Sequence, residues 1–167
     1  MSNFYNDLAI GKRGESLVAA ALAARGHIVE DKSEDKAYQF NDIDFLLINK
    51  AGQQTTLEVK NDLASERTGN LFIETYNEYN RSHSYKGWFF YCGATYICFI
   101  QEHSGKAHII AFDDLRQAIE TKKYREISTS TTKGYLLPVA AVETLPSYFC
   151  LLLENNVSRE TIGGVKQ

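Results

Sequence analysis

Basic residues are not in excess in this sequence. Its 18 Lys and Arg residues face 21 Asp and Glu residues, which gives a formal net charge of −3. No overall positive field therefore indicates nucleic-acid binding, and any such contact needs a local basic patch. The three cysteines, Cys92, Cys98 and Cys150, are odd in number and lack metal-ligand spacing. We expect them to be small buried hydrophobes in a reducing, cytoplasmic setting.

Long apolar segments are also missing. The longest apolar run, Trp88–Ile100, is too short to cross a bilayer and contains Gly93, while Met1–Gly11 lacks the apolar run of a secretory signal. No membrane partner is expected. There is no glycine-rich phosphate loop, and no Ser/His/Asp or Cys/His set stands out. These absences disfavour nucleotide turnover and catalysis through a side-chain nucleophile.

The chain has the composition and length of one globular domain. Its 167 residues are 44% hydrophobic and 12% aromatic, enough to bury a sizeable core. We expect a single domain over residues 1–155 and a flexible C-terminal tail over 156–167. The mixed order of helical and strand patterns predicts an α/β fold, a central mixed β-sheet flanked by helices.

Periodicity and turn residues locate the expected elements. One helix is predicted over 6–25, capped by Asn6 or Asp7 and stopped by Gly26, and another over 114–122 after an Asp113 cap. A short helix is predicted from Pro146. Apart from the hairpin over residues 41–61, strands are expected at 27–30, 71–75, 95–100, 106–112 and 134–142. Loops are expected at 31–40 and 61–70, and a loop or edge segment at 126–133.

A β-hairpin over residues 41–61 is the central feature. Its strands run from Ile43 to Ile48 and from Thr55 to Lys60, around a turn at 50–52 in which Gly52 can take a positive φ. Glu58 and Lys60 are two residues apart, so they share one face while Val59 points to the other. Folding back at Gly52 places Glu58 and Lys60 near positions 46 and 44, at the end of the hairpin that carries Asp44.

Two carboxylates and an ammonium on an apolar hairpin are costly unless they are solvated, paired or bound to a ligand. Mg²⁺ would relieve this cost, because it prefers one or two carboxylates together with waters and phosphate oxygens. Lys60 would then lie beside the attacking water. Alternatively, Glu58 and Lys60 form a cross-strand surface pair and Asp44 only begins a strand.

Asp44 followed by Glu58-Val59-Lys60 resembles the signature of the PD-(D/E)XK nuclease superfamily. Upstream, Gly11–Glu15 and Ala19 resemble the first helix of its Holliday-junction-resolvase-like branch. The resemblance covers roughly residues 10–75 and extends to about 112. It departs at Ile43, where the name-giving proline of the family would stand.

The resemblance implies a restriction-endonuclease-like core and an Mg²⁺-dependent DNA endonuclease, with Mn²⁺ able to substitute. Asp44, Glu58 and the backbone carbonyl of Val59 would hold the metal, and Lys60 would position and deprotonate the attacking water. Glu15, on the first helix, would assist through a second ion or a bridging water. A structure-specific substrate, such as a junction or branched DNA, and a homodimer are further expectations.

Several alternatives stay open. Asp42 shares a face with Asp44 and competes for its role, and Glu74 could add a further acid. Phosphate contacts are predicted for four basic residues, each of which can equally be a solvated surface residue: Lys12, Arg13, Arg67 and Lys86. Interleaved aromatic and basic residues over 76–86 could stack on unpaired bases. A nucleic-acid-binding module without activity and an RNA-directed nuclease are the alternative functions.

Overall fold

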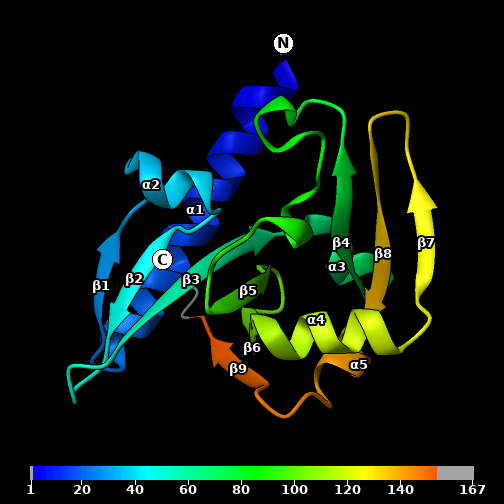
Figure 1. Ribbon diagram of the computed structural model, residues 1–167. Helices are drawn as coiled ribbons and strands as arrows, with labels where there is room; N and C mark the ends of the chain where they lie inside the picture. Colours follow the sequence, from blue (N-terminus) through cyan, green and yellow to red (C-terminus); the bar gives the residue numbers. More distant parts are fainter. Residues whose placement is uncertain (1, 154–167) are drawn as a thin grey trace, which may run out of the picture.

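The computed structural model describes residues 2–153, with side chains described for residues 8–153, and is shown in Figure 1. Its elements, in chain order, are α1 (Ser2–Ala24), β1 (Ile28–Asp31), α2 (Lys36–Phe40), β2 (Phe45–Ile48), β3 (Gln54–Asn61), α3 (Leu63–Thr68), β4 (Asn70–Asn77), η1 (Arg81–His83), η2 (Trp88–Phe90), β5 (Tyr96–Gln101), β6 (Lys106–Ala111), α4 (Phe112–Thr121), β7 (Arg125–Ser128), β8 (Thr132–Pro138), α5 (Val139–Val142) and β9 (Phe149–Leu152). The elements η1 and η2 are single 3₁₀ turns.

The described strands form two sheets. The larger has six strands in the order β1-β2-β3-β5-β6-β9, and the smaller has three in the order β4-β8-β7. In the larger sheet β3 and β5 are parallel, and the other neighbours are antiparallel. The predicted fold class, α/β with a central mixed sheet flanked by helices, is confirmed.

The long helix α1 covers one face of the six-stranded sheet (Figure 1). Its buried residues Val18 and Leu22 pack against Leu57 of β3 and Ile100 of β5. A buried glycine, Gly14, faces the sheet one turn earlier, and the side chains of Asn61 and Ile100 fill the space that a Cβ there would need. This close approach brings the first half of α1 to the C-terminal end of β3.

The opposite face of the large sheet packs against the small sheet, α4 and η2. Phe99 of β5 meets Trp88 of η2 with their rings 6.1 Å apart, and Trp88 lies the same distance from Phe112 of α4. Leu137 of β8 and Leu71 of β4 complete this core and are fully buried. Strand β5 therefore supplies side chains to both cores in alternation, as expected of a central strand buried on both faces.

Two predicted loops contain short helices. The segment expected to be a loop over 31–40 ends in α2, because the Asp35 carboxylate accepts a hydrogen bond from the Ala37 N–H. The segment over 61–70 contains α3, whose first turn is capped by Asp62 through the Ala64 N–H and whose end is set by Gly69 at φ 68°. An aspartate at the N-cap stabilises the first turn of a helix even without apolar periodicity.

The C-terminal predictions were wrong in several details. The helix expected from Pro146 is a strand, β9, which pairs with the free edge of β6. The strand expected over 134–142 ends at Pro138 and continues as α5. Asp113 lies inside the first turn of α4 and does not cap it. The predicted tail, 156–167, lies outside the described residues.

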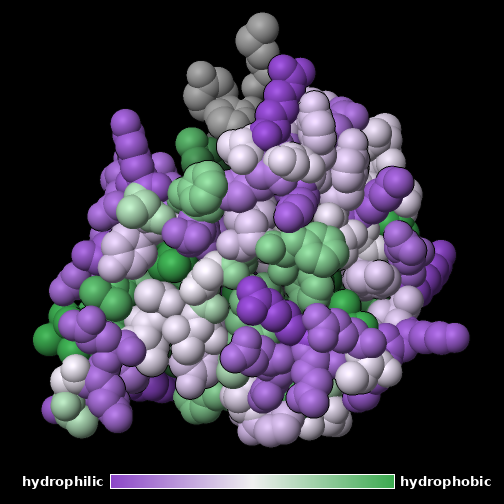
Figure 2. All heavy atoms as spheres, in the orientation of Figure 1, coloured by the Kyte–Doolittle hydropathy of each residue, from purple (hydrophilic) through white to green (hydrophobic). Residues whose placement is uncertain are grey.

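The N-terminal boundary was also wrong, since α1 begins at Ser2 and not after a cap at Asn6 or Asp7. The predicted strand over 71–75 is β4, which belongs to the small sheet. The segment over 126–133, predicted as a loop or an edge segment, runs from the edge strand β7 into the start of β8. Within residues 2–153, no helix is both long enough and apolar enough to span a membrane. On the face shown in Figure 2, hydrophobic residues lie in separate patches among hydrophilic ones.

Two adjacent leucines test the assignment of β9 as a strand. Leu151 is 0% exposed and Leu152 is 59% exposed, as expected for neighbours on opposite faces of a strand. We expect Leu151→Ala to lower the free energy of unfolding by about 2–5 kcal/mol, and Leu152→Ala to change it by less than about 0.5 kcal/mol. Urea unfolding of both variants measures the difference, and equal losses would contradict the strand.

Candidate active site

The hairpin of β2 and β3 sets the position of the candidate site. Phe45 pairs with Leu57, and the Asp44 N–H donates to the Leu57 carbonyl at 3.1 Å. One residue beyond the Phe45–Leu57 pair, this register places Glu58 opposite Asp44. Three residues beyond it, Lys60 lies opposite Asp42. The predicted register, with Glu58 and Lys60 near 46 and 44, was off by two residues.

The turn explains this shift. It does not centre on Gly52: the Asn49 side-chain oxygen accepts hydrogen bonds from the N–H groups of Ala51 and Gln53, and the Asn49 N–H donates to the Gln53 carbonyl at 3.0 Å. The five-residue loop is thus symmetric about Ala51. A turn centred one residue earlier shifts every cross-strand pair by two.

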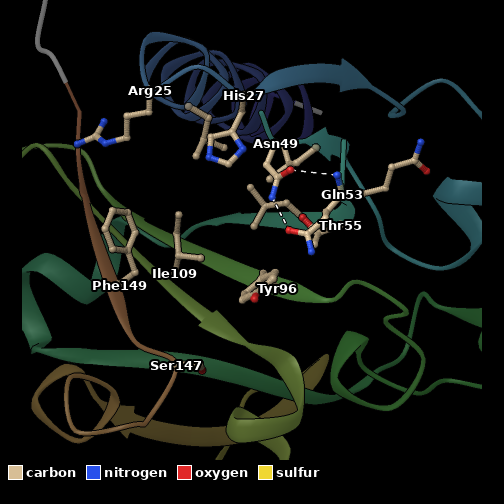
Figure 3. Close-up of a pocket in the computed structure, with 13 residues that line it drawn as sticks. Arg25, His27, Asn49, Gln53, Thr55, Tyr96, Ile109, Ser147 and Phe149 are labelled. Carbon is tan, nitrogen blue, oxygen red and sulfur yellow. Dashed lines mark hydrogen bonds between the residues drawn. The ribbon is translucent and has the colours of Figure 1, made fainter. Parts of the chain in front are cut away.

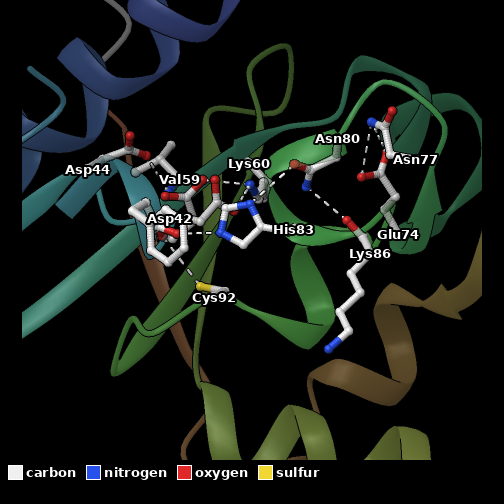
Figure 4. A network of polar contacts seen from close by, with 12 residues as sticks. Asp42, Asp44, Val59, Lys60, Glu74, Asn77, Asn80, His83, Lys86 and Cys92 are labelled. Carbon is white, nitrogen blue, oxygen red and sulfur yellow. Dashed lines mark hydrogen bonds and ion pairs between the residues drawn. The ribbon is translucent and has the colours of Figure 1, made fainter. Parts of the chain in front are cut away.

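The shift brings an additional acid to the lysine. The Lys60 Nζ lies 2.6 Å from Glu58 Oε1 and 2.6 Å from Asp42 Oδ2 (Figure 4). The Asp44 Oδ2 instead accepts the Val59 N–H at 2.8 Å. We call Asp42, Asp44, Glu58 and Lys60 the site cluster. The two aspartates that competed for one role in the sequence thus have different contacts: Asp42 pairs with the lysine, and Asp44 binds the backbone of β3.

Glu58 is the most buried member of the site cluster, at 5% exposure. Burial raises the pKa of Glu58 well above its ordinary value, and the nearby carboxylates of Asp42 and Asp44 raise it further, whereas Lys60 opposes the shift. Burial also raises the pKa of Asp44, which the Val59 hydrogen bond partly offsets. The site cluster therefore places three carboxyl groups around one lysine, which cannot neutralise the charge of all three.

Lys60 is charged in this setting. Burial alone would lower the pKa of Lys60, but attraction by Glu58 and Asp42 outweighs it and raises the pKa well above the ordinary value. Its ammonium also lies 5.2 Å from the ring centre of Trp88, where the ring face stabilises a cation. Trp88 was not predicted as part of the site, because a tryptophan within an apolar run gives no functional signal.

The backbone polar groups of Val59 point toward the β2 side of β3. The Leu57 carbonyl points toward β2, and backbone groups two residues apart in a strand point the same way, so the N–H and carbonyl of Val59 do as well. At that level β2 has ended, and the Asp44 side chain has taken the place of a partner strand. The Val59 side chain meanwhile is buried in the core beneath α1, as predicted.

Glu15 lies on α1, the helix packed beside the hairpin. Burial raises the pKa of Glu15 and the charge of Asp44 raises it further, whereas Lys12 lowers it. Its partner on the helix is Lys12, at 3.5 Å. The Asn61 side chain fixes this part of α1 by donating to the Ile10 carbonyl at 3.0 Å. Of the four residues predicted as catalytic, the structure thus brings Asp44, Glu58 and Lys60 together at the end of the hairpin, while Glu15 lies on α1 and contacts Lys12.

A groove of about 310 Å³ opens beside Lys60 on the face that carries Trp88, and Glu74 and Phe72 of β4 line its other side. Burial raises the pKa of Glu74, and the Asn77 amide opposes the shift. Glu74 therefore borders the groove without joining the site cluster. Asp42 has an unusual backbone for a residue with a side chain, φ 53°, and such strain is concentrated at functional positions.

The four predicted phosphate contacts are not equally placed. Arg13 forms two hydrogen bonds with the Glu102 carboxylate and so helps to dock α1 on the sheet. Lys12 donates to the Ser33 hydroxyl at 2.9 Å. Arg67 is exposed on α3, and the Lys86 side chain extends away from Lys60 (Figure 4). None of the four has its cationic group within the site cluster.

Among the described residues, no three His, Cys, Asp or Glu side chains form a metal-binding group by themselves. A separate cavity of about 600 Å³ lies at the other end of the hairpin, beneath α1 (Figure 3). Arg25, His27 and Asn49 line its rim over an apolar floor, and no acidic residue lines it. It therefore lacks the carboxylates that distinguish the site cluster.

The buried Glu58 makes a specific prediction about pH. Its pKa in the folded protein lies above the ordinary value of 4.5, so the folded state retains a proton that the unfolded chain releases. Stability contributed by Glu58 must fall as pH rises above about 4.5. We expect the free energy of unfolding of the unaltered protein, relative to that of Glu58→Gln, to fall as the pH rises from about 4.5 to about 8.

Urea unfolding in metal-free buffer across this pH range measures the effect. Glu120→Gln, which removes one carboxylate from an exposed position on α4, is the matched control and should show no such trend. If the free energy of unfolding of the unaltered protein, relative to that of Glu58→Gln, stays constant or increases as the pH rises, burial does not disfavour the Glu58 carboxylate.

Comparison with known proteins adds no relative. No protein-family model, no curated protein and no solved structure matches this chain. Any proposal for the function of this chain therefore rests on the geometry of the site cluster and of the groove beside it.

Proposed function

We propose that this chain is an Mg²⁺-dependent DNA endonuclease of the PD-(D/E)XK type. The observation that carries the proposal is the convergence of Asp44, Glu58 and Lys60 at one open end of a single hairpin, with Glu58 buried and Lys60 charged. A buried carboxylate of raised pKa beside an opening is a recognised mark of a functional site. Structural surface pairs do not need this burial.

The donor atoms fit Mg²⁺ in kind. Asp44 and Glu58 supply two carboxylates, and the Val59 carbonyl faces the same side as the N–H that Asp44 accepts. Mg²⁺ uses one or two carboxylates, keeps several waters and takes phosphate oxygens from its substrate, so a group of three protein carboxylates is not required. The excess of negative charge in the site cluster is the complement of a divalent cation. Mn²⁺ has similar ligand preferences and can take the same place.

A bound Mg²⁺ would polarise a phosphate oxygen and stabilise the charge that develops on the leaving oxygen. The remaining work falls to the residues of this chain. Lys60, held between Asp42 and Glu58, donates hydrogen bonds to the attacking water or to the phosphate. Because Lys60 is charged here, it acts as a hydrogen-bond donor that positions the water and neutralises anionic charge. The sequence-based expectation that Lys60 also removes a proton from the water is not kept, since proton removal needs a neutral amine.

Glu15 and Asp42 complete the arrangement from the two sides. Glu15 lies on α1, and the charge of Asp44 raises its pKa; it would hold a water or a second ion on that side. Asp42 orients the ammonium of Lys60 through its 2.6 Å contact. The reaction is direct hydrolysis: the water oxygen bonds to phosphorus and gives up one proton to solvent, the bond from phosphorus to the leaving oxygen breaks, and the leaving oxygen takes up one proton from solvent.

The architecture supports the same proposal. A central mixed sheet flanked by helices, with the hairpin at β2 and β3 and α1 packed beside its active end, is what the restriction-endonuclease-like core requires. The absence of a positive charge excess agrees with a site that depends on bound cations to hold a phosphate. A structure-specific preference and a homodimer stay within the proposal as its finer expectations.

Cleavage of a labelled DNA panel tests the proposal: blunt duplex, single strand, flap and four-way junction, each with Mg²⁺ or Mn²⁺ and with a chelator. We expect metal-dependent cleavage by the unaltered protein. Asp44→Asn and Lys60→Ala should each lower the rate by at least about 100-fold, because each removes a group that acts on the reacting phosphate. Lys50→Ala, an exposed lysine in the turn of the same hairpin, should retain full activity.

Circular dichroism and thermal unfolding confirm that each variant is folded. If no DNA is cleaved but DNA is bound, the chain is a binding module without activity. Cleavage of the matching RNA panel alone would assign an RNA substrate. Cleavage that persists in Asp44→Asn and Lys60→Ala would rule out the site cluster as the active site.

A further inference from the structure

Three aromatic rings form a stack beside the site cluster. The ring of His83 lies 3.8 Å from that of Tyr91, at an interplanar angle of 23°, and 4.4 Å from that of Phe40, at 31°. We call Phe40, His83 and Tyr91 the ring stack. Its outer ring, Phe40, is 57% exposed, so the stack ends at the surface of the protein.

The ring stack is held in place by polar contacts. The His83 Nε2 donates to the Phe40 carbonyl oxygen at 2.8 Å, and its Nδ1 can then accept from the Ser82 hydroxyl at 3.2 Å, beside the Asn80 side-chain oxygen. Asn80 in turn donates to the Lys86 carbonyl at 2.9 Å. Ser84 and Tyr85 accept positive φ values of 54° and 64° in the same loop. Both nitrogens of the middle ring are thus engaged, so its plane is fixed before any ligand arrives.

The ring stack is also joined to the site cluster. Phe40 is two residues from Asp42, whose carboxylate contacts Lys60 at 2.6 Å. At the other end of the stack, Tyr91 precedes Cys92, whose thiol donates to the Asp42 carbonyl at 3.4 Å. Both outer rings therefore come from segments that also position Asp42. Through Asp42 the ring stack is linked to Lys60, the residue proposed to meet the phosphate.

We propose that Phe40 is a stacking platform for an unpaired nucleobase beside the phosphate to be cleaved, so that the substrate is single-stranded DNA or DNA with an unpaired segment. The inference rests on the proposed nuclease function. An unpaired base can add a fourth ring to the stack, whereas the bases of an intact duplex already stack on one another. Base stacking on an aromatic side chain needs no particular sequence, because every base has a flat aromatic face.

The charge of the protein favours this mode of binding. The net charge is −3, and of the four basic residues predicted to contact phosphate, Arg13 is occupied by Glu102. Affinity for duplex DNA comes largely from many phosphate contacts. None of the four has its cationic group within the site cluster, and a preformed ring stack beside that cluster is better suited to a short unpaired segment.

Binding in a chelator, where no cleavage occurs, tests the platform separately from the activity. Fluorescence anisotropy compares a labelled single strand with the blunt duplex of the same sequence, for the full chain and three variants. We expect Phe40→Ala to weaken single-strand binding by about 5- to 150-fold and to change duplex binding by less than twofold. Phe40→Trp should retain single-strand binding, since it preserves a stacking face.

Phe90→Ala is the matched control: Phe90 is 56% exposed but lies outside the ring stack, so this variant should bind as the unaltered protein does. A single strand carrying 2-aminopurine adds a direct signal, because stacking on Phe40 quenches its fluorescence. Loss of this quenching in Phe40→Ala and its return in Phe40→Trp would support the platform; a purely structural role for Phe40 would not give that pattern.

The outcomes separate the two proposals. Selective loss of single-strand binding in Phe40→Ala, with no cleavage of any DNA by the unaltered protein, would support the platform and overturn the nuclease. Equal effects of Phe40→Ala on single strand and duplex, no effect on either, or no DNA binding at all would overturn the platform. Metal-dependent cleavage by Phe40→Ala at the full rate on unpaired DNA would do the same while leaving the nuclease in place.

Discussion

The contact of Lys60 with Glu58 and Asp42 is the interaction on which this site depends. An ammonium placed within 2.6 Å of two carboxylates, one of them almost fully buried, stays charged at a cost in desolvation that only close pairing offsets. The surrounding structure maintains that pairing. The β2–β3 register places Asp42 opposite Lys60, the strain at Asp42 turns the chain toward it, and the face of Trp88 lies 5.2 Å away from the ammonium.

Much of this arrangement follows from local rules in the sequence. Period-two alternation correctly placed Glu58 and Lys60 on one face and Val59 in the core, and helical periodicity correctly identified α1. The hairpin register failed because Asn49, an unremarkable residue in the sequence, builds the turn with its side chain. The error in the register changed the prediction for the site. With the pairing off by two residues, the contact of Lys60 with Asp42 was not predicted, and Asp42 stayed an alternative to Asp44.

Other features depend on contacts that no local pattern encodes. The small sheet forms because β4 pairs with β8, more than fifty residues further along the chain, and not with the strands of the hairpin. β9 could not be told from a helix, since a short apolar run is compatible with either until the free edge of β6 is known. The ring stack combines α2, η1 and the residue after η2, and its loop depends on positive φ values at Ser84 and Tyr85, which non-glycine residues seldom adopt. Composition suggested aromatic stacking over 76–86, but it could not identify Phe40.

The charge distribution links these observations. The open end of the hairpin carries Asp42, Asp44 and Glu58 against a single lysine. In the proposed nuclease, this excess of carboxylates would repel a phosphate until a cation is bound, so metal and phosphate binding would reinforce each other, since each reduces the charge that opposes the other. Stacking on an uncharged ring is not subject to this repulsion. A base held by Phe40 would keep the strand close to the site while the cation and the phosphate assemble, which gives an acidic protein a way to hold a polyanion without a basic surface.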